Sequence, residues 1–383
     1  MTDALPVVTV WRDTGTAWAL AGQVATFDTL TFEPRHLDPG TWSMTMPYDG
    51  QATAITRDRL VAVDWRGVRS TWCVESFVPS SDANGQPILT VGGPGALSVV
   101  GRALAWPNPT AAIGSQPTAG DYAGPTETVL HDLIAQNLRD RYGARVTVAA
   151  SAGRGTVLTA VRPRFDNLLE LVEKKGRFGG VGVSAGLVST SGTRADLRVG
   201  FYVPVDKSGR VRLSARSGTL RQWTQTETAP TVTSVLVGGA GSGTGRVFRQ
   251  VTTTDSVASA TAWGGHREVF VDDSGSSDAA ELDQAGQTAL KAGVDTTTLA
   301  LVAGEAEGLK AFRDYAPGDT ATGEVLTGVS VTDVITAITV SVSSTGIDVT
   351  PVFGDPNTTA PPMAQAAMIR ALRRRIRNLE SGR

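Results

Sequence analysis

The sequence predicts a mainly β fold: two small antiparallel β-barrel-like domains flanking an α+β domain, plus a C-terminal helix. Short β-prone runs separated by turn residues fill the first hundred residues and return after residue 221. Two amphipathic helical patterns lie between them, and a regular apolar spacing marks residues 359–383. Because 383 residues exceed one ordinary core, we place the domains at 1–105, 106–220, 221–358 and 359–383.

Residues 1–105 are predicted to form the first β-barrel domain. From Trp42 to Met46 apolar and polar residues alternate, which places the apolar side chains on one face of a strand. Turn signals such as Asp38-Pro39-Gly40 separate the runs. Strands are expected at 7–11, 18–20, 41–46, 60–64, 71–77 and 88–91.

Residues 106–220 are predicted to form the α+β domain, after a proline-rich connector. One helix is expected to begin at Thr126 as its N-cap, with an apolar side that reaches Leu138. A second is expected to be capped by Asp166 and to end at Gly176. Strand patterns at 145–149, 181–184 and 197–203 surround the two helices.

Residues 221–358 are predicted to form the second β-barrel domain. One helix, Ala279 to Lys291, interrupts its strands, and Asp278 is its expected N-cap. The glycine-rich stretch 237–246 resembles a phosphate-binding loop, but a strand and not a helix follows it, which favours a hairpin connection. Strands are expected at 232–237, 246–251, 268–271, 324–331, 337–342 and 347–352.

The C-terminal segment 359–383 carries the clearest pattern in the chain. Its apolar residues Ile369, Leu372, Ile376 and Leu379 are spaced 3, 4 and 3 apart, which predicts an oligomerisation seam of the coiled-coil type. Two heptads are too few for an autonomous coiled coil, so a larger assembly is expected to hold the copies together. The alternatives are an amphipathic helix packed on another surface and a basic tail for nucleic acid or lipid.

Composition limits the classes of function. The single cysteine, Cys73, excludes an internal disulfide and a cysteine-cluster metal site, and its apolar neighbours predict that it is buried. Six arginines and one glutamate give residues 359–383 a charge of +5, which leaves −7 on the remainder of a chain whose net charge is −2. No signal peptide or membrane span is predicted, so we expect synthesis in a reducing cytoplasm without membrane insertion.

The sequence offers little support for catalysis or cofactor binding. The three histidines, His36, His131 and His266, lie about a hundred residues apart and suggest neither a metal site nor a catalytic triad. The acidic stretch 272–278 lacks the ligand spacing of a calcium loop and is interpreted as a polar turn. We expect no enzyme activity, no catalytic or metal-binding residues and no cofactor.

Six phrases, in order, resemble the tail-associated (Tal) or baseplate hub family of long-tailed phages, in particular minor tail proteins of phages of actinobacteria. They are FEPRHLDPGTWSMTMP at 32–47, LSVVGR at 97–102, PRFDNLLEL at 163–171, VRLSARSGTL at 211–220, VLVGG at 235–239 and YAPGD at 315–319. Each phrase is loose, and their order over residues 5–355 carries the resemblance.

The resemblance implies a structural hub of the virion tail tip or baseplate. Such a hub is a homotrimer in which two barrels per subunit form a pseudo-sixfold ring. The ring joins the tail tube and distal tail protein to downstream tip or fibre proteins, and lets DNA and the tape-measure protein pass without specific DNA binding. The alternatives are a cell-wall-degrading enzyme, which needs paired carboxylates, and a saccharide- or receptor-binding tail component, for which the eight tryptophans are candidates.

Overall fold

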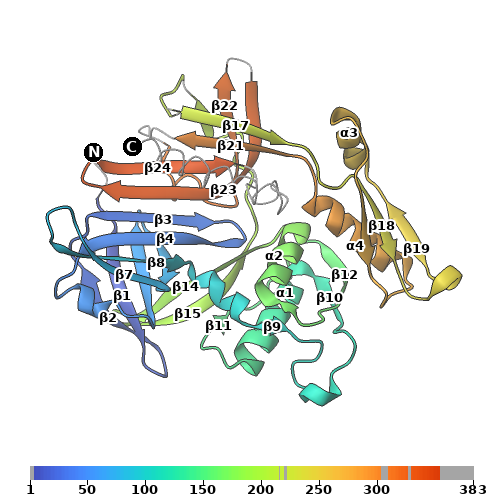
Figure 1. Ribbon diagram of the computed structural model, residues 1–383, viewed down its shortest axis with the longest axis horizontal. Helices are drawn as coiled ribbons and strands as arrows, with labels where there is room; N and C mark the ends of the chain where they lie inside the picture. The colour runs from blue at the N-terminus through green and yellow to red at the C-terminus, as the bar shows by residue number, and fades with distance from the viewer. Residues whose placement is uncertain (1–3, 215, 220–221, 303–308, 327–328, 354–383) are drawn as a thin grey trace, which may run out of the picture. The chain divides into compact units, whose positions relative to one another are not determined.

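The computed structural model describes residues 4–214, 216–219, 222–302, 309–326 and 329–353. They divide into two compact units. The first holds residues up to Thr224 together with Leu299–Phe353, and the second holds Gln225–Thr298. Strands dominate the described residues (Figure 1), which confirms the predicted mainly β fold.

The first sheet of the first unit is built mostly from antiparallel neighbours. Its strand order is β11-β15-β2-β1-β5-β6, with β14 paired to β15. Asp64 of β5 lies opposite Arg69 of β6 in this register, a pair that returns in the site below. The strands are β1 (Val7–Asp13), β2 (Trp18–Val24), β5 (Arg59–Trp65), β6 (Val68–Cys73), β11 (Thr147–Val148), β14 (Gly182–Ser191) and β15 (Arg194–Tyr202).

The second sheet joins strands from both ends of the chain. Its order is β17-β21-β24-β23-β3-β4-β8-β7, with β22 paired to β23 and β16 to β22. Val340 of β23 pairs with Phe32 of β3, so the late strands extend a sheet begun near the N-terminus. The strands are β3 (Thr29–Arg35), β4 (Asp38–Pro47), β7 (Ser76–Ser81), β8 (Pro87–Pro94), β16 (Arg212–Ser214), β17 (Gln222–Thr228), β21 (Thr296–Val302), β22 (Thr320–Leu326), β23 (Val329–Ser343) and β24 (Gly346–Phe353).

The two sheets enclose an apolar core. Phe32 makes edge-to-face contacts with Trp65 and Trp72, with ring centroids 6.2 and 6.3 Å apart. Such pairs stabilise a core beyond the area that they bury. Trp11 lies in a second core, which includes side chains from two helices. The first sheet therefore contributes to two separate cores.

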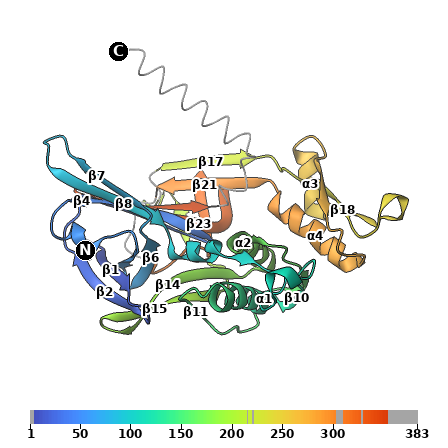
Figure 2. The same cartoon turned by 60° about the horizontal axis from the view of Figure 1, so that its bottom comes forward.

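These helices, α1 (Thr126–Ile134) and α2 (Leu168–Gly179), lie beside β14 and β15 (Figure 2). The predicted Asp166 cap is wrong, because Asn167 caps α2 by accepting from the Leu169 and Glu170 amides. The helix also continues past Gly176 to a left-handed Gly180. Thr126 is the first residue of α1 and not its N-cap, and a π-helix, Ala135–Arg141, extends α1. Two short ladders complete this part: β10 (Tyr122–Pro125) with β12 (Val157–Val161), and β9 (Leu104–Ala105) with β13 (Asp166–Asn167).

The second unit is a small α/β module. β18 (Ser234–Gly238) pairs antiparallel with β19 (Phe248–Val251) and parallel with β20 (Glu268–Asp272). Helix α4 (Ala279–Ala292) begins after the predicted cap, Asp278, whose carboxylate accepts from two backbone amides. The predicted glycine-rich hairpin is confirmed as the connection between β18 and β19. Helix α3 (Thr254–Ala262), which the sequence reading did not predict, begins with a capping box of Thr253 and Ser256.

The compact units follow a different division from the four consecutive domains expected from the sequence. Residues 225–298 stand apart, whereas the strands of 299–353 belong to the first unit. The reason is the pairing of β23 with β3, since an alternating pattern shows that a strand exists but not which partner it takes. The expected C-terminal segment 359–383 lies outside the described residues.

Candidate functional site

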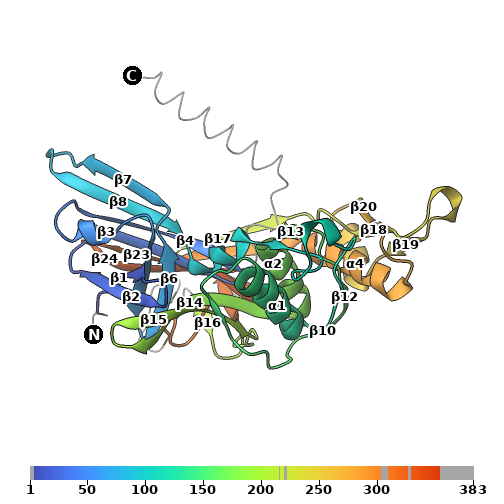
Figure 3. The same ribbon diagram turned by 90° about the horizontal axis from the view of Figure 1, so that it is seen from below.

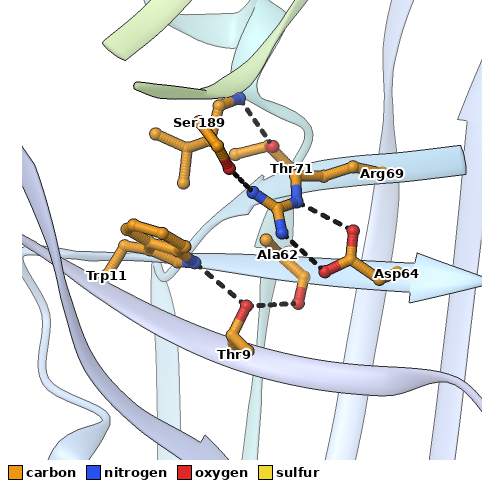
Figure 4. A network of polar contacts seen from close by, with 8 residues as sticks. Thr9, Trp11, Ala62, Asp64, Arg69, Thr71 and Ser189 are labelled. Carbon is orange, nitrogen blue, oxygen red and sulfur yellow. Dashed lines mark hydrogen bonds and ion pairs between the residues drawn. The ribbon is translucent and has the colours of Figure 1, made fainter. Parts of the chain in front are cut away.

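A network of polar contacts in the first unit lies where β14 meets β6 (Figure 4). The strand order of the described residues places no backbone ladder between these two strands. Two side-chain contacts join them instead. The Arg69 Nη1 donates to Ser189 Oγ at 2.9 Å, and the Leu187 amide donates to Thr71 Oγ1 at 3.0 Å. Side chains therefore connect the early strands to the hairpin of β14 and β15.

Arg69 is held in a fixed position by its neighbours. Its Nε and Nη2 donate to the two carboxylate oxygens of Asp64, each at 2.8 Å, in the paired geometry that guanidinium and carboxylate favour. The hydrogen bonds that Arg69 donates to the Asp64 carboxylate raise the pKa of Arg69. Its guanidinium lies 5.5 Å from the Trp11 ring centroid, and the Trp11 indole donates to Thr9 Oγ1 at 2.9 Å. These contacts hold the charged Arg69 guanidinium between Asp64, Ser189 and Trp11.

A shallow groove of about 520 Å³ adjoins this network, and Arg69 and Arg198 line it together with residues 184–189 and Gly200. The Arg198 side chain makes no hydrogen bond or ion pair with any residue that the structure describes. The groove presents fixed positive charge, hydroxyl groups and two glycines. Among the described residues that line the groove, no nucleophile is paired with a base.

The three histidines that sequence reasoning considered lie in separate surroundings. The predicted seam residues Ile369, Leu372, Ile376 and Leu379 lie outside the described part of the chain, so the seam stays a prediction. His36 Nδ1 lies 2.7 Å from Tyr202 Oη. His131 contacts its neighbour Asp132 at 2.9 Å, and the exposed His266 lies in the other unit. Within the described ranges, no group of three or more His, Cys, Asp and Glu side chains is arranged to hold a metal ion.

Cys73 and four of the eight tryptophans are buried in the described part of the chain. Cys73 is buried, as predicted, and burial raises the pKa of its thiol. Trp11, Trp42 and Trp65 are also buried, which removes them as sugar-stacking platforms. The acidic stretch 272–278 is a turn that precedes the α4 cap, as predicted.

Sequence reasoning missed an ion pair between the buried Glu127 of α1 and the exposed Arg154. Both carboxylate oxygens of Glu127 accept from the guanidinium at 2.7 Å, and one also accepts from the Arg154 amide at 3.0 Å. The hydrogen bond from Arg154 lowers the pKa of Glu127 to about 2. The two residues are 27 positions apart and belong to no motif, so no sequence signal pointed to them.

His36 and Tyr202 belong to a second cluster of the first unit. Burial, followed by the negative charge of Asp319, raises the pKa of Tyr202. Asp319 itself pairs with Lys207 at 2.8 Å and accepts from the Ala316 amide. This cluster fixes the YAPGD phrase against β15, which is a structural role. No helix among the described residues is long and apolar enough to cross a lipid bilayer.

Comparison with solved structures finds the same fold in three tail proteins. The prophage MuSo2 43 kDa tail protein from Shewanella oneidensis shares 15% identity over 92% of this chain and 100% of its own, with a TM-score of 0.57. The prophage tail protein gp18 from Listeria monocytogenes shares 12% identity over 96% and 99%, with a TM-score of 0.56. The tail protein from Neisseria meningitidis shares 13% over 93% and 98%, also at 0.56.

A search of curated proteins finds no match. A family model described as Siphovirus ReqiPepy6 Gp37-like protein matches residues 7–355, which is most of the chain. The chain therefore belongs to the family of Siphovirus ReqiPepy6 Gp37-like proteins.

Proposed function

We propose that this chain is a structural protein of a phage tail and a hub subunit of the tail tip or baseplate. The observation that carries the proposal is the extent of the fold similarity, because nearly all of this chain aligns with nearly all of three tail proteins. Family membership over residues 7–355 supports the same assignment. In this proposal the protein is located in the virion and acts through its surfaces, without enzyme activity.

The hub is proposed to be a homotrimeric, pseudo-sixfold ring. An exposed strand edge supports this. β7 ends the second sheet, and the β7–β8 hairpin projects beyond the neighbouring strands (Figure 3). Five of the six residues of β7 are exposed, including Val78. An uncovered edge favours pairing with another chain, and head-to-tail contacts that close into a ring satisfy such edges without open aggregation.

The proposed ring joins the tail tube and the distal tail protein to downstream tip or fibre proteins. DNA and the tape-measure protein pass through its channel. Residues 1–358 carry a charge of −7, so we expect an acidic or neutral channel surface that does not retain DNA phosphates. Synthesis in the host cytoplasm precedes incorporation into the virion.

The mass of the purified protein in solution tests the ring. We expect particles of three 39.9 kDa chains, visible as rings by negative-stain microscopy. Val78→Lys should shift the mass toward monomers, because it places a charge on the β7 edge. The matched control, Val157→Lys, changes an exposed valine of β12 and should leave the trimer unchanged. Particles of another stoichiometry, or equal effects of the two variants, would contradict the proposed edge contact.

A further inference from the structure

The three-stranded sheet of the second unit has two unlike faces. On one face, Val235 and Val237 pack with Leu282 and Leu290 of α4. Arg249 of β19 points to the same side, where its guanidinium pairs with Asp283 of α4 at 2.7 Å. Side chains alternate along a strand, so the other residues of β18, β19 and β20 form the opposite face. We call this opposite face the outer face.

The outer face is apolar at its centre. Phe248 and Phe270 are about half exposed, at 50% and 51%. The register places them on either side of β18, because Phe248 pairs with Gly238 and Phe270 with Leu236. The Arg246 guanidinium lies 5.6 and 5.5 Å from the two ring centroids and pairs with Asp272. A side chain at Gly238 would collide with the Phe270 ring, so the glycine allows the ring to lie flat across the strand.

The sheet of the second unit is mixed, because β18 pairs parallel with β20 and antiparallel with β19. All-parallel sheets are usually covered on both faces by helices, and the solvent face of an antiparallel sheet is usually polar, so an exposed apolar face is unusual for either kind. Here α4 covers one face, whereas the two phenyl rings on the other remain exposed in the described part of the chain. Adjacent exposed aromatic rings rimmed by charges are typical of a docking surface. A helix with an apolar stripe would cover such a face.

We propose that residues 366–380 of the same chain form that helix and dock on the outer face. Their apolar residues Ile369, Leu372, Ile376 and Leu379 form one stripe in a helix. From residue 369 to 379 the helix spans about 15 Å, and a five-residue strand spans about 16 Å. The stripe thus matches the length of the face that it covers.

Charge favours the same pairing. Residues 225–298 hold nine acidic and four basic residues, a net charge of −5, whereas residues 359–383 carry +5. Glu268 lies exposed on the outer face, and its side chain has no partner among the described residues. Arginines beside the stripe, such as Arg373, supply the complementary charge. These contacts add attraction at the rim of an apolar interface.

Docking uses the same four side chains as the predicted seam between sister copies, so the two arrangements compete. A seam of two heptads lacks the length to be stable alone. The sheet face is already folded, and a tether in the same chain raises the local concentration of the helix to about the millimolar range. Both effects favour docking on the outer face of the same chain over a seam between copies. The inference stands apart from the proposed hub, because neither ring closure nor tail location enters the argument.

Disulfide trapping in the full-length chain tests the docking. Gln250→Cys on the outer face is combined with Arg373→Cys, and the control pairs Arg373→Cys with Gln86→Cys, an exposed glutamine of the first unit. The buried Cys73 stays unreactive. On mild oxidation we expect the 250–373 disulfide to form within one chain about tenfold faster than the control, because docking holds the two sites together. Equal rates, or a 250–373 disulfide that joins two chains, would overturn the proposal.

Alkylation of the single variant Gln250→Cys gives a second measurement. Leu372→Asp should release the helix from the outer face. Because docking at a millimolar effective concentration protects the thiol, its loss should speed alkylation about tenfold. Ala371→Asp, which lies off the stripe, should leave the rate unchanged. Equal effects of the two substitutions would overturn the docking. The particle mass of the same samples is measured separately. Trimers in which the thiol introduced at position 250 is alkylated at the unprotected rate would contradict the docking and would still support the hub.

Discussion

The two compact units differ in how their sheets are covered. In the first unit, two sheets bury each other's faces, and large side chains such as Phe32, Met44 and Trp72 are almost inaccessible to solvent. In the second unit, a core of five buried side chains lies under one face of a three-stranded sheet. The first unit therefore has a large core between two sheets, whereas the second is a small module that leaves one face of its sheet exposed among the described residues.

Truncation of Trp72 should show how much the first core contributes. Trp72 is 2% exposed and packs edge-to-face on Phe32. Trp72→Ala should lower the free energy of unfolding by about 3–5 kcal/mol, because it leaves a large cavity. Trp263→Ala in the second unit is the control, since that ring is 37% exposed, and should cost about 1 kcal/mol. Denaturant titration measures both, and similar losses would contradict the contrast between the cores.

Matched leucine truncations should separate the two units. Leu282→Ala in the second unit and Leu89→Ala in the first each remove a fully buried side chain, at a cost of about 2–5 kcal/mol. Hydrogen exchange should then rise only in the strands and helices of the unit that carries the change. If each variant loosened both units equally, the chain would unfold as one body and the division would be wrong.

The Glu127–Arg154 pair should make the α+β part sensitive to acid. The pKa of Glu127 is lowered from 4.5 to about 2, so its contribution to stability is complete above pH 4.5 and is lost as the pH falls through 2. Glu127→Gln should therefore flatten the pH dependence of the unfolding free energy between these values. Asp121→Asn, at an exposed carboxylate that has no partner among the described residues, is the control. Identical profiles for wild type and Glu127→Gln would contradict this assignment.

Replacement of Arg69 should have the smallest effect. Arg69→Lys keeps the charge but loses the paired contact with Asp64 and the bond to Ser189. The site is partly exposed, so the loss should stay below about 1 kcal/mol. Arg198→Lys, at an unpaired position, should change nothing measurable. Thermal unfolding compares the two variants. A larger effect of Arg198→Lys would show that the Arg69 contacts do not stabilise the packing of β14 on β6.

Local features were predicted from the sequence more accurately than distant pairings. The hairpin at 237–246 and the Asp278 cap of α4 depend on neighbouring residues, and both were predicted. Asp166 and Asn167 are equally good caps, so only the backbone geometry selects Asn167. Helix α3 was missed because its threonines, serines and alanines provide no apolar stripe.

Distant pairings escaped prediction for a different reason. β3 was not predicted, and its pairing with β23 joins segments about three hundred residues apart. The expected strand at 324–331 is divided between β22, which ends at Leu326, and β23, which begins at Val329. The contact of Arg69 with Ser189 likewise joins residues 120 positions apart. Pattern and propensity carry no information on such partners.

Electron microscopy of tails assembled with the tagged chain tests the central claim most directly. The account predicts three copies per tail, arranged as a closed ring at the tip around the channel. A tail that carries the chain along its tube, in another copy number, or not at all would contradict the assignment as a tail-tip hub.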